Sequence, residues 1–389
     1  MIGEKTMDKL ERLTADTEEV VTIEELKTVL NKDKPKAYIG FEPSGTVHLG
    51  WKICTNKIKD FLDCGFDFTV LLADWHAYIN DKLDGDIEKI KLCGRYMEDC
   101  FASMGIDKDK VHFVYASDYV GDSKYWELVL RTSKATSVKR VKRAMDIMGR
   151  EEDEAERDLS KLFYPAMQVS DIFYLDLDVA YGGMDQRHAH MLARDVSKKI
   201  GRKPPVAIHT PLLTGLQAGG RMVPESPLKN IPPAGGADIK RPGDYNKQLQ
   251  VKSILGSTAS NADFKMSKSK PDSMISIHDD PKSVKKKIGK AFCPEKTVKG
   301  NPILEICKYI VFPELHGDVF LIERPEKFGG NLEFKNYIDL EQAFANGLHP
   351  LDLKNATASH VNKILEPVHQ YFEQHTENYD KMKELGIIL

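Results

Sequence analysis

Short apolar runs alternate with helical segments through roughly the first half of the chain, and this alternation most constrains the fold. The runs cover residues 37–41, 66–73, 110–115, 179–180 and 206–209. Strands separated by helices are typical of a parallel sheet with helices on both faces. We therefore predict an α/β fold of the Rossmann type. In such sheets ligands bind at the carboxyl ends of the strands, so the turns after the strands are the first candidates for a functional site.

The remainder of the 389-residue chain has a different texture. Residues 1–36 carry apolar positions at helical spacing and predict an N-terminal helical segment. A Rossmann-type domain is predicted at 37–282, and the prolines and glycines at residues 217–263 within it predict a long irregular loop. Residues 283–389 predict a mainly helical C-terminal domain, interrupted by a Pro/Gly-rich stretch at 324–330.

Composition narrows the class of protein. No apolar stretch approaches the roughly 20 residues that span a bilayer, and the N-terminus carries charges of both signs instead of a signal peptide's apolar core. We expect a cytoplasmic protein without a membrane partner. The cysteines form no C-x-x-C pair and no zinc spacing, so we expect reduced thiols and no metal site: Cys54, Cys64, Cys93, Cys100, Cys293 and Cys307.

Two short motifs carry candidate chemistry. His48-Leu49-Gly50 follows the first predicted strand, where an imidazole and bare backbone beside a helix start suit a nucleotide phosphate. Residues 264–270, Phe-Lys-Met-Ser-Lys-Ser-Lys, place lysines and hydroxyls in one short loop that can neutralise a departing pyrophosphate. Each motif alone is weak, and basic runs at 134–143 and 282–290 are typical of solvated helix faces. The informative feature is that the His48 motif comes first, the lysine-rich loop at 264–270 comes later, and an α/β pattern lies between them.

Several longer stretches match one family. They are AYIGFEPSG at 37–45, LLADWHAY at 71–78, YPAMQVSD at 164–171, GGMDQR at 182–187, KMSKS at 265–269, RPEKFGG at 324–330 and HPLDLKN at 349–355. On these stretches the chain resembles the tyrosyl-tRNA synthetases of the archaeal and eukaryotic type, which are class I aminoacyl-tRNA synthetases. The resemblance implies a Rossmann-type catalytic domain with a helical insertion at about 117–165 that forms a homodimer interface, and a C-terminal anticodon-binding domain.

The resemblance also implies ligands and roles. The substrates are L-tyrosine, ATP accompanied by Mg²⁺, and tRNA(Tyr). The implied tyrosine site is Tyr38, Gly40, Glu42, Leu71, His76, Tyr164, Gln168, Asp171 and Gln186. The implied ATP site is His48, Gly50, Asp185, Met266, Ser267 and Ser269, with His48, Lys265 and Lys268 as catalytic residues. The implied tRNA contacts are Arg143, Arg187, Phe328, His349, Pro350 and Asp352.

The residues support part of this assignment independently. Tyr164, Gln168 and Asp171 are four and three residues apart, which places them on one face of a helix. A carboxylate can accept a phenolic hydrogen while a tyrosine hydroxyl donates to the phenolic oxygen, so Asp171 and Tyr38 suit a tyrosine ligand. A tryptophanyl synthetase is the enzyme alternative, although an indole offers only a donor.

Trp51 marks a departure from the family, which usually has a second histidine here in an H-x-G-H motif. Two hypotheses follow: Trp51 stacks near the adenine in an active enzyme, or the chain is an RNA-binding paralogue that has lost catalysis. The loop before residue 265 is also longer than the family usually shows.

Overall fold

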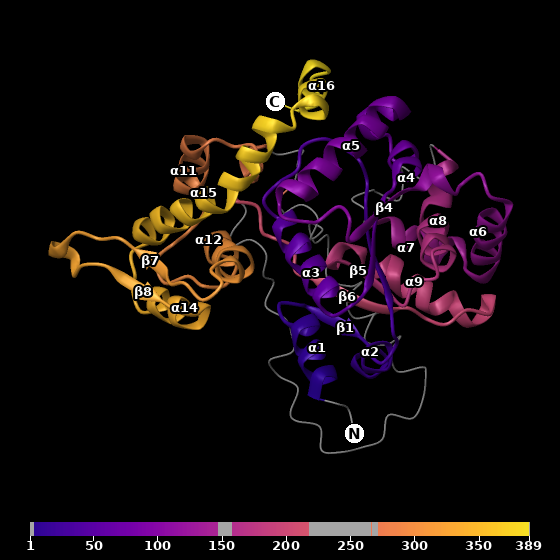
Figure 1. Cartoon of the computed structure of the whole chain (residues 1–389), viewed down its shortest axis with the longest axis horizontal. Coiled ribbons are helices and arrows are strands. Elements are labelled where there is room, and N and C mark those ends of the chain that lie inside the picture. The colour runs from indigo at the N-terminus through magenta and orange to yellow at the C-terminus, as the bar shows by residue number, and fades with distance from the viewer. Residues whose placement is uncertain (1–3, 147–157, 218–265, 267–270, 389) are drawn as a thin grey trace.

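The computed structural model describes residues 4–146, 158–217, 266 and 271–388. A larger part holds a six-stranded sheet, and a mainly helical part follows it (Figure 1). The predicted irregular loop at 217–263 lies almost entirely outside the described residues, as do Lys265, Ser267, Lys268 and Ser269.

The central sheet confirms the predicted strands. Its spatial order is β1-β6-β5-β2-β3-β4, and β2 pairs in parallel with both β3 and β5. The chain therefore builds β2, β3 and β4 in one direction and then returns to the other side of β2. Such a reversal opens a crevice at the carboxyl ends of the two central strands. The bounds are Glu19–Val21 (β1), Lys36–Phe41 (β2), Asp67–Leu72 (β3), Val111–Tyr115 (β4), Val179–Gly183 (β5) and Val206–Thr210 (β6).

The N-terminal segment differs from the prediction of helix throughout residues 1–36. Helix α1 (Glu4–Thr14) and α2 (Ile23–Val29) flank strand β1, which pairs antiparallel with β6. The Glu-Val-Val sequence of β1 is short, and its β-branched residues suit a sheet edge. Residues 19–21 are therefore strand because β6 offers an unpaired edge, which helical spacing in the sequence does not reveal.

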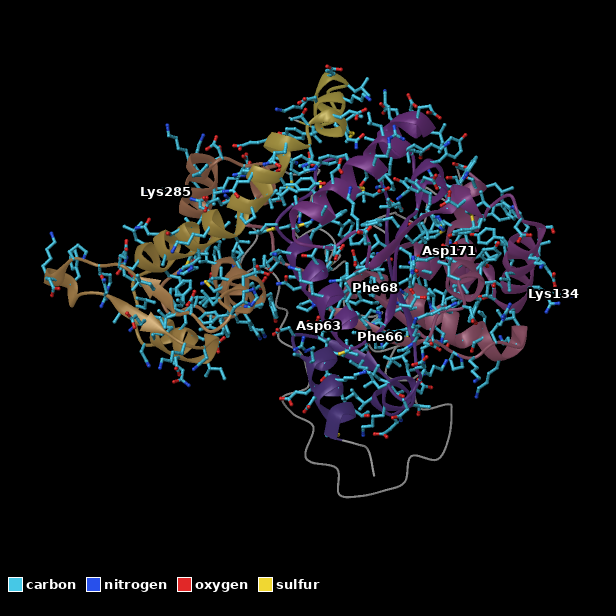
Figure 2. All side chains as sticks on the ribbon, in the orientation of Figure 1. Asp63, Phe66, Phe68, Lys134, Asp171 and Lys285 are labelled. Carbon is cyan, nitrogen blue, oxygen red and sulfur yellow. The ribbon has the colours of Figure 1, made fainter. Side chains whose placement is uncertain are left out.

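The two faces of the sheet carry different helices because side chains alternate along each strand. Ala37 and Ile39 of β2 pack toward α1, α3 and α5, whereas Tyr38 packs toward α4, α6, α8 and α9. The bounds are Trp51–Asp63 (α3), Asp74–Ile79 (α4), Ile87–Ser103 (α5), Ser123–Ala135 (α6), Val138–Asp146 (α7), Ser160–Tyr174 (α8) and Arg187–Ser197 (α9). Figure 2 shows Phe68 and Asp171 inside this part and Lys134 at its outer edge.

The C-terminal part shares its core with the larger part. Buried residues of α11 and α15 belong to the same apolar cluster as the α3 and α5 face of the sheet. Lys52 of α3 also lies 3.1 Å from the Glu314 carboxylate. The helices are Pro281–Lys290 (α11), Pro302–Ile306 (α12), Phe312–Glu314 (α13), Tyr337–Ala345 (α14), Pro350–Gln374 (α15) and Glu377–Glu384 (α16).

One feature of this part was missed by the sequence pattern. The Pro/Gly-rich stretch at 324–330 joins two short antiparallel strands, Phe320–Ile322 (β7) and Leu332–Phe334 (β8). Each strand has only three residues, too few to show a period. No helix among the described residues is long and apolar enough to cross a membrane.

Candidate active site

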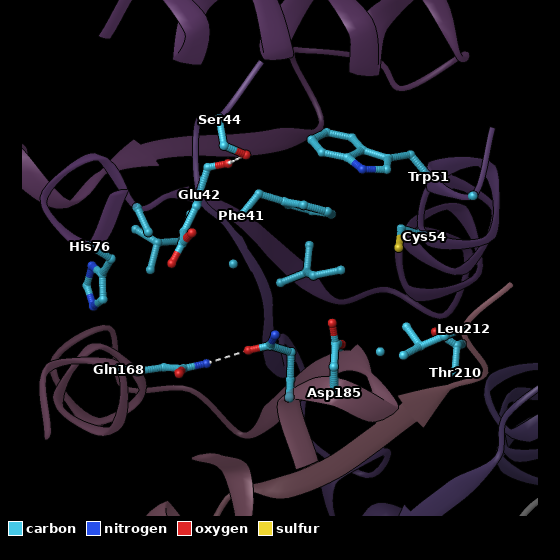
Figure 3. Close-up of a pocket in the computed structure, with 18 of the residues that line it drawn as sticks. Phe41, Glu42, Ser44, Trp51, Cys54, His76, Gln168, Asp185, Thr210 and Leu212 are labelled. Carbon is cyan, nitrogen blue, oxygen red and sulfur yellow. Dashed lines mark hydrogen bonds between the residues drawn. The ribbon is translucent and has the colours of Figure 1, made fainter. Parts of the chain in front are cut away.

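A cavity of about 320 Å³ opens at the carboxyl ends of β2 and β5, where the strand order reverses. Figure 3 shows His76 and Gln168 on one side of it and Trp51, Cys54 and Leu212 on the other. The structure brings the whole predicted tyrosine site to its wall: Tyr38, Gly40, Glu42, Leu71, His76, Tyr164, Gln168, Asp171 and Gln186. The described part of the predicted ATP site also lines it: His48, Gly50, Asp185 and Met266.

Helix α8 presents three polar residues to the cavity, as their spacing predicts. The Tyr164 hydroxyl donates to the Glu42 carboxylate, and Gln168 Nε2 donates to Gln186 Oε1 at 2.9 Å. Gln168 Oε1 is buried and accepts no hydrogen bond from the described residues. A buried acceptor without a donor is costly, so this group suits a ligand that brings N–H groups.

Asp171 is 1% exposed, and its carboxylate is held from three directions. Oδ1 accepts hydrogen bonds from the Tyr119 hydroxyl at 2.8 Å and the Tyr125 hydroxyl at 2.9 Å. Oδ2 lies 3.0 Å from His76 Nε2, yet accepts no well-aligned hydrogen bond from the described residues. The carboxylate is therefore fixed in place with one oxygen available for a further donor.

The surroundings at this end of the cavity raise the pKa values of both Tyr38 and His76. Burial and then the Asp171 carboxylate raise the pKa of Tyr38, so its hydroxyl keeps its proton and can donate. Burial alone would lower the pKa of His76, but the carboxylates of Asp171, Glu42 and Asp74 together outweigh it and raise that pKa.

Glu42 carries most of the polar contacts at the other end of the α8 face. Besides Tyr164, its carboxylate accepts from Asn80 Nδ2 at 2.9 Å and lies 3.6 Å from Lys82 Nζ. Together with Gln168 Oε1, it makes this end of the cavity rich in acceptors. An ammonium group fits such a set of oxygens.

The His48 turn is fixed by backbone geometry. Gly50 N–H donates to His48 Nδ1 at 3.1 Å, and a Cβ on Gly50 would lie 2.8 Å from the imidazole. Any side chain at position 50 would displace this ring. Since Nδ1 accepts, the proton of the neutral ring sits on Nε2, the atom that can donate to a phosphate oxygen. Helix α3 starts at the next residue, and its N-terminus favours negative charge.

Trp51 belongs to an aromatic group beside that turn. Its ring lies 4.2 Å from Phe41 and 5.2 Å from Phe101, centroid to centroid, and it is 7% exposed. Trp51 also lines the cavity (Figure 3). The residue is thus packed against Phe41 at the end of β2, with part of its surface facing the cavity.

The end of β5 supplies the opposite wall. A Cβ on Gly183 would come within 2.8 Å of the Asp185 carboxylate and 2.7 Å of Leu212. The absence of a side chain at 183 lets Asp185 turn back toward the cavity. Met266, 3% exposed, closes this side, and its amide donates to Leu213 at 2.9 Å.

The predicted tRNA residues lie outside the cavity. Arg187 at the start of α9 donates two hydrogen bonds to Glu19 of β1, at 2.7 and 2.8 Å. Arg143 is exposed on α7, and its carbonyl accepts from His188 at 3.2 Å. Both arginines therefore flank the same rim of the larger part, where α7 meets α9.

The other predicted tRNA residues belong to the C-terminal part. Phe328 is 63% exposed between β7 and β8. His349 caps the start of α15, where its Nδ1 accepts from Leu351 N–H at 3.2 Å, and Pro350 and Asp352 occupy the first turn. The cap role alone would account for His349.

Several residues of the site were missed by sequence reasoning. Tyr119 and Tyr125 hold Asp171 from segments that no local spacing connects to α8. Asn80 is a different case, because it lies four residues after His76 and helical spacing predicts that the two share a side. The cavity wall also includes Phe41, Cys54, Thr210, Pro211, Leu212 and Leu213.

Comparisons with known proteins point in one direction. The profile of the family "tRNA synthetases class I (W and Y)" matches residues 30–223 and 244–366. The chain is 48% identical over 372 residues to a tyrosine–tRNA ligase of Sulfurisphaera tokodaii, covering 95% of this chain and 94% of that protein.

Solved structures agree with the sequence relatives. A tyrosyl-tRNA synthetase from Aeropyrum pernix matches with a TM-score of 0.79 and 40% identity, covering 98% of each chain. A tyrosyl-tRNA synthetase from Pyrococcus horikoshii, complexed with L-tyrosine, matches with a TM-score of 0.81 and 39% identity, covering 97% of this chain and 99% of that one.

The His76–Asp171 pair predicts a pH dependence of stability. The pKa of His76 is raised above 6.5, so the charged pair contributes stability below that pH and loses it as the pH rises through the raised value. We expect His76→Gln to destabilise the protein more at pH 5.5 than at pH 9, by about 1 kcal/mol or more. Urea unfolding of both proteins at the two pH values measures this.

A matched control is the exposed His112–Asp67 pair, whose nitrogen and oxygen lie 2.8 Å apart. Exposed pairs contribute little, so His112→Gln should show almost no difference between the two pH values. An equal cost of His76→Gln at both pH values would show that His76 does not titrate in this range.

Proposed function

The chain belongs to the class I tRNA synthetases of the tryptophan and tyrosine family, and we propose that it is a tyrosine–tRNA ligase. It activates L-tyrosine with ATP to tyrosyl-adenylate and transfers the tyrosyl group to tRNA(Tyr). The names of the relatives favour tyrosine over tryptophan within this family.

The observation that carries the choice of amino acid is the buried polar end of the cavity. The Tyr38 hydroxyl keeps its proton and can donate, while Asp171 Oδ2 accepts no hydrogen bond from the described residues. A phenol satisfies both groups, since its oxygen accepts and its hydrogen is donated. An indole would satisfy Asp171 and leave Tyr38 without an acceptor.

The α-amino group is assigned to the acceptor-rich end. Gln168 Oε1, Gln186 Oε1 and the Glu42 carboxylate are acceptors among the residues that line the cavity together with Asp171. With the ammonium held there, the carboxylate of the substrate points toward His48 and Asp185. This leaves the reacting group on the ATP side of the cavity.

Adenylate formation then needs little besides positioning. An oxygen of the tyrosine carboxylate attacks the α-phosphorus of ATP, and the bond from that phosphorus to the bridging oxygen of pyrophosphate breaks. His48 Nε2–H and the N-terminus of α3 stabilise the charge that develops on phosphate oxygens. Asp185, which lines the cavity, is proposed to accept a hydrogen bond from a ribose hydroxyl. Lys265 and Lys268, outside the described residues, are proposed to neutralise the departing pyrophosphate.

Magnesium is proposed to arrive with ATP. Among the described residues, no group of three or more histidine, cysteine or acidic side chains is arranged to hold a metal ion. Mg²⁺ is commonly bound through substrate phosphates and one or two carboxylates, and Asp185 is a carboxylate on the ATP side of the cavity.

Transfer requires the tRNA acceptor end at the cavity and the anticodon elsewhere. The ribose hydroxyl of the terminal nucleotide attacks the carbonyl of the adenylate and releases AMP. Arg143 and Arg187 flank one rim and suit the acceptor end, and Phe328 offers an exposed ring on which a base can stack.

We further propose that residues 283–389 form the anticodon-binding domain. We also propose that the protein is a homodimer through the helices at about 117–165 and that it is cytoplasmic.

The first test is pyrophosphate exchange into ATP. Tyrosine should support exchange, whereas phenylalanine gives Asp171 Oδ2 no donor and the Tyr38 hydroxyl no phenolic oxygen. Each such group costs ~1–3 kcal/mol, so we expect kcat/KM for phenylalanine to be at least roughly 30-fold lower. Comparable exchange with phenylalanine or tryptophan would refute the assignment, and no exchange with any of them would favour a non-catalytic RNA-binding protein.

Trp51 provides a second test. If its ring faces the adenine, Trp51→Ala should raise the KM for ATP roughly 2- to 10-fold and leave tyrosine affinity unchanged. Trp51→Phe keeps a ring, so its KM for ATP should lie between those of the native protein and Trp51→Ala. The measurement is the pyrophosphate-exchange rate of each protein at several ATP concentrations. If Trp51→Ala has the same ATP dependence as the native protein, Trp51 is not part of the nucleotide site.

Asp352 tests the C-terminal assignment. A carboxylate that accepts from a base is worth ~1–3 kcal/mol, so Asp352→Ala should lower tRNA charging roughly 5- to 150-fold with exchange intact. Glu366→Ala, on an exposed position of the same helix, is the control and should charge normally. If Asp352→Ala charges tRNA as well as the control does, the anticodon site lies elsewhere.

A further inference from the structure

The C-terminal end of the chain does not project from the C-terminal part but returns to the larger one. Helix α15 runs toward α5, and α16 lies beside the end of α5 (Figure 1). Asp99 of α5 accepts from Asn378 Nδ2 at 2.8 Å, and Met382 is fully buried. We call residues 371–388 the C-terminal tail.

The tail covers one histidine that no step of the proposed reaction uses. The ring of His278 lies 4.3 Å from that of Tyr379 in a stacked arrangement and 4.7 Å from Phe372 in an edge arrangement. On its remaining side, Tyr96 of α5 stacks at 5.7 Å. The Tyr96 hydroxyl and His278 Nε2 lie 2.8 Å apart. His278 is thus clamped between α5 and the tail.

His278 remains a neutral ring in this environment. Burial, with the nearby His369 and Lys383, lowers its pKa to about 3. The Tyr96 hydroxyl and Nε2 of the neutral ring share one hydrogen bond, whose donor depends on the tautomer, and the ring packs as an aromatic group with a fixed orientation. Three rings from three elements meet here, so the position of His278 is set by contacts from all of them.

The segment that carries His278 holds the His48 turn. Leu49 N–H donates to Ile275 at 2.8 Å, and Ile277 N–H donates to Val47 at 3.2 Å. His48 and Ser276 form the antiparallel bridge between these two bonds. Ile275 and Ile277 are fully buried, so this segment, residues 275–278, cannot shift without moving the turn.

A second approach brings the tail close to the turn that follows β2. A Cβ on Gly45 would meet the Ile387 carbonyl at 3.6 Å, and Gly45 N–H donates to Cys93 Sγ of α5 at 3.1 Å. Gly45 has a φ of +108°, a backbone conformation that favours glycine. The turn between Glu42 and His48 is therefore bounded by α5 on one side and by the tail on the other.

We propose that the C-terminal tail is a positioning element for adenylate formation: through His278 and residues 275–277 it fixes the His48 turn at the ATP side of the cavity. The role rests on the proposed tyrosine–tRNA ligase activity. Tyr379 and Phe372 touch no residue of the cavity wall directly in these contacts, so they are positioning and not catalytic residues.

A tail that only added stability would have a different signature. Loosening it would lower the amount of folded protein and would leave the kinetic constants of the folded fraction unchanged. A positioning role instead changes the use of ATP, because the His48 turn faces ATP, and spares tyrosine binding, because Asp171 and Gln168 lie on α8.

The experiment compares Tyr379→Ala with two controls at a temperature where all are folded. Tyr379→Phe keeps the stacked ring, and Lys381→Ala changes an exposed residue of α16 whose partner is Glu377 at 2.8 Å. Pyrophosphate exchange gives kcat and the KM for ATP, and calorimetry gives tyrosine affinity. Amide hydrogen exchange at Leu49 and Ile277 reports the turn directly.

We expect Tyr379→Ala to lower kcat/KM for ATP roughly 2- to 10-fold, the size of one lost ring contact, with tyrosine affinity unchanged and the Leu49 and Ile277 amides exchanging faster. Tyr379→Phe and Lys381→Ala should equal the native protein in kcat/KM for ATP, in tyrosine affinity and in amide exchange. Unchanged ATP kinetics and amide exchange in folded Tyr379→Ala would overturn the proposal, as would tyrosine affinity falling in step with the rate. If Tyr379→Ala does not fold, Phe372→Leu replaces it with the same expected outcomes.

The two levels of inference fail separately. If the native protein shows no exchange with tyrosine, the proposed activity fails, while the Leu49 and Ile277 amides still measure whether the tail holds the turn. If the native protein is active and the tail variant equals it in both readouts, only the positioning role fails.

Discussion

The pairing of β2 with both β3 and β5 is the constraint on which the rest of the site depends. It sets the turn after Phe41 beside the turn after Gly183, although the two are about 140 residues apart in the sequence. Backbone hydrogen bonds on both sides of β2 hold this juxtaposition, so neither turn needs to be stabilised by the ligand. The cavity is a consequence of strand order, and the side chains around it supply only its chemistry.

Asp171 shows what that chemistry requires. A buried carboxylate is unfavourable unless it is hydrogen-bonded or paired, and here its partners come from the segment after β4, from α6 and from α4. The groups that fix Asp171 also leave it one open oxygen. The selection of a phenol therefore depends on contacts among four segments that meet only in the folded chain.

This distribution of contacts explains which elements and site residues could be predicted from the sequence. The apolar run of β2 and the helical spacing on the face of α8 could be predicted because both patterns are local. The short strands β1, β7 and β8 could not, since three residues carry no period and their formation depends on a neighbouring edge or turn. Tyr119 and Tyr125 were missed for a related reason: a tyrosine in sequence shows nothing about which carboxylate it will meet.

Helix α15 adds a constraint of a different kind. Its 25 residues span about 38 Å at 1.5 Å per residue, from the cap at His349 to the start of the tail. The helix contains one interior proline, Pro367, which removes a backbone hydrogen bond near its C-terminal end. One end of α15 begins at the exposed His349, and the other brings Phe372 against the ring of His278. The C-terminal part therefore contacts the segment beside the His48 turn, although none of the residues 283–389 lines the cavity.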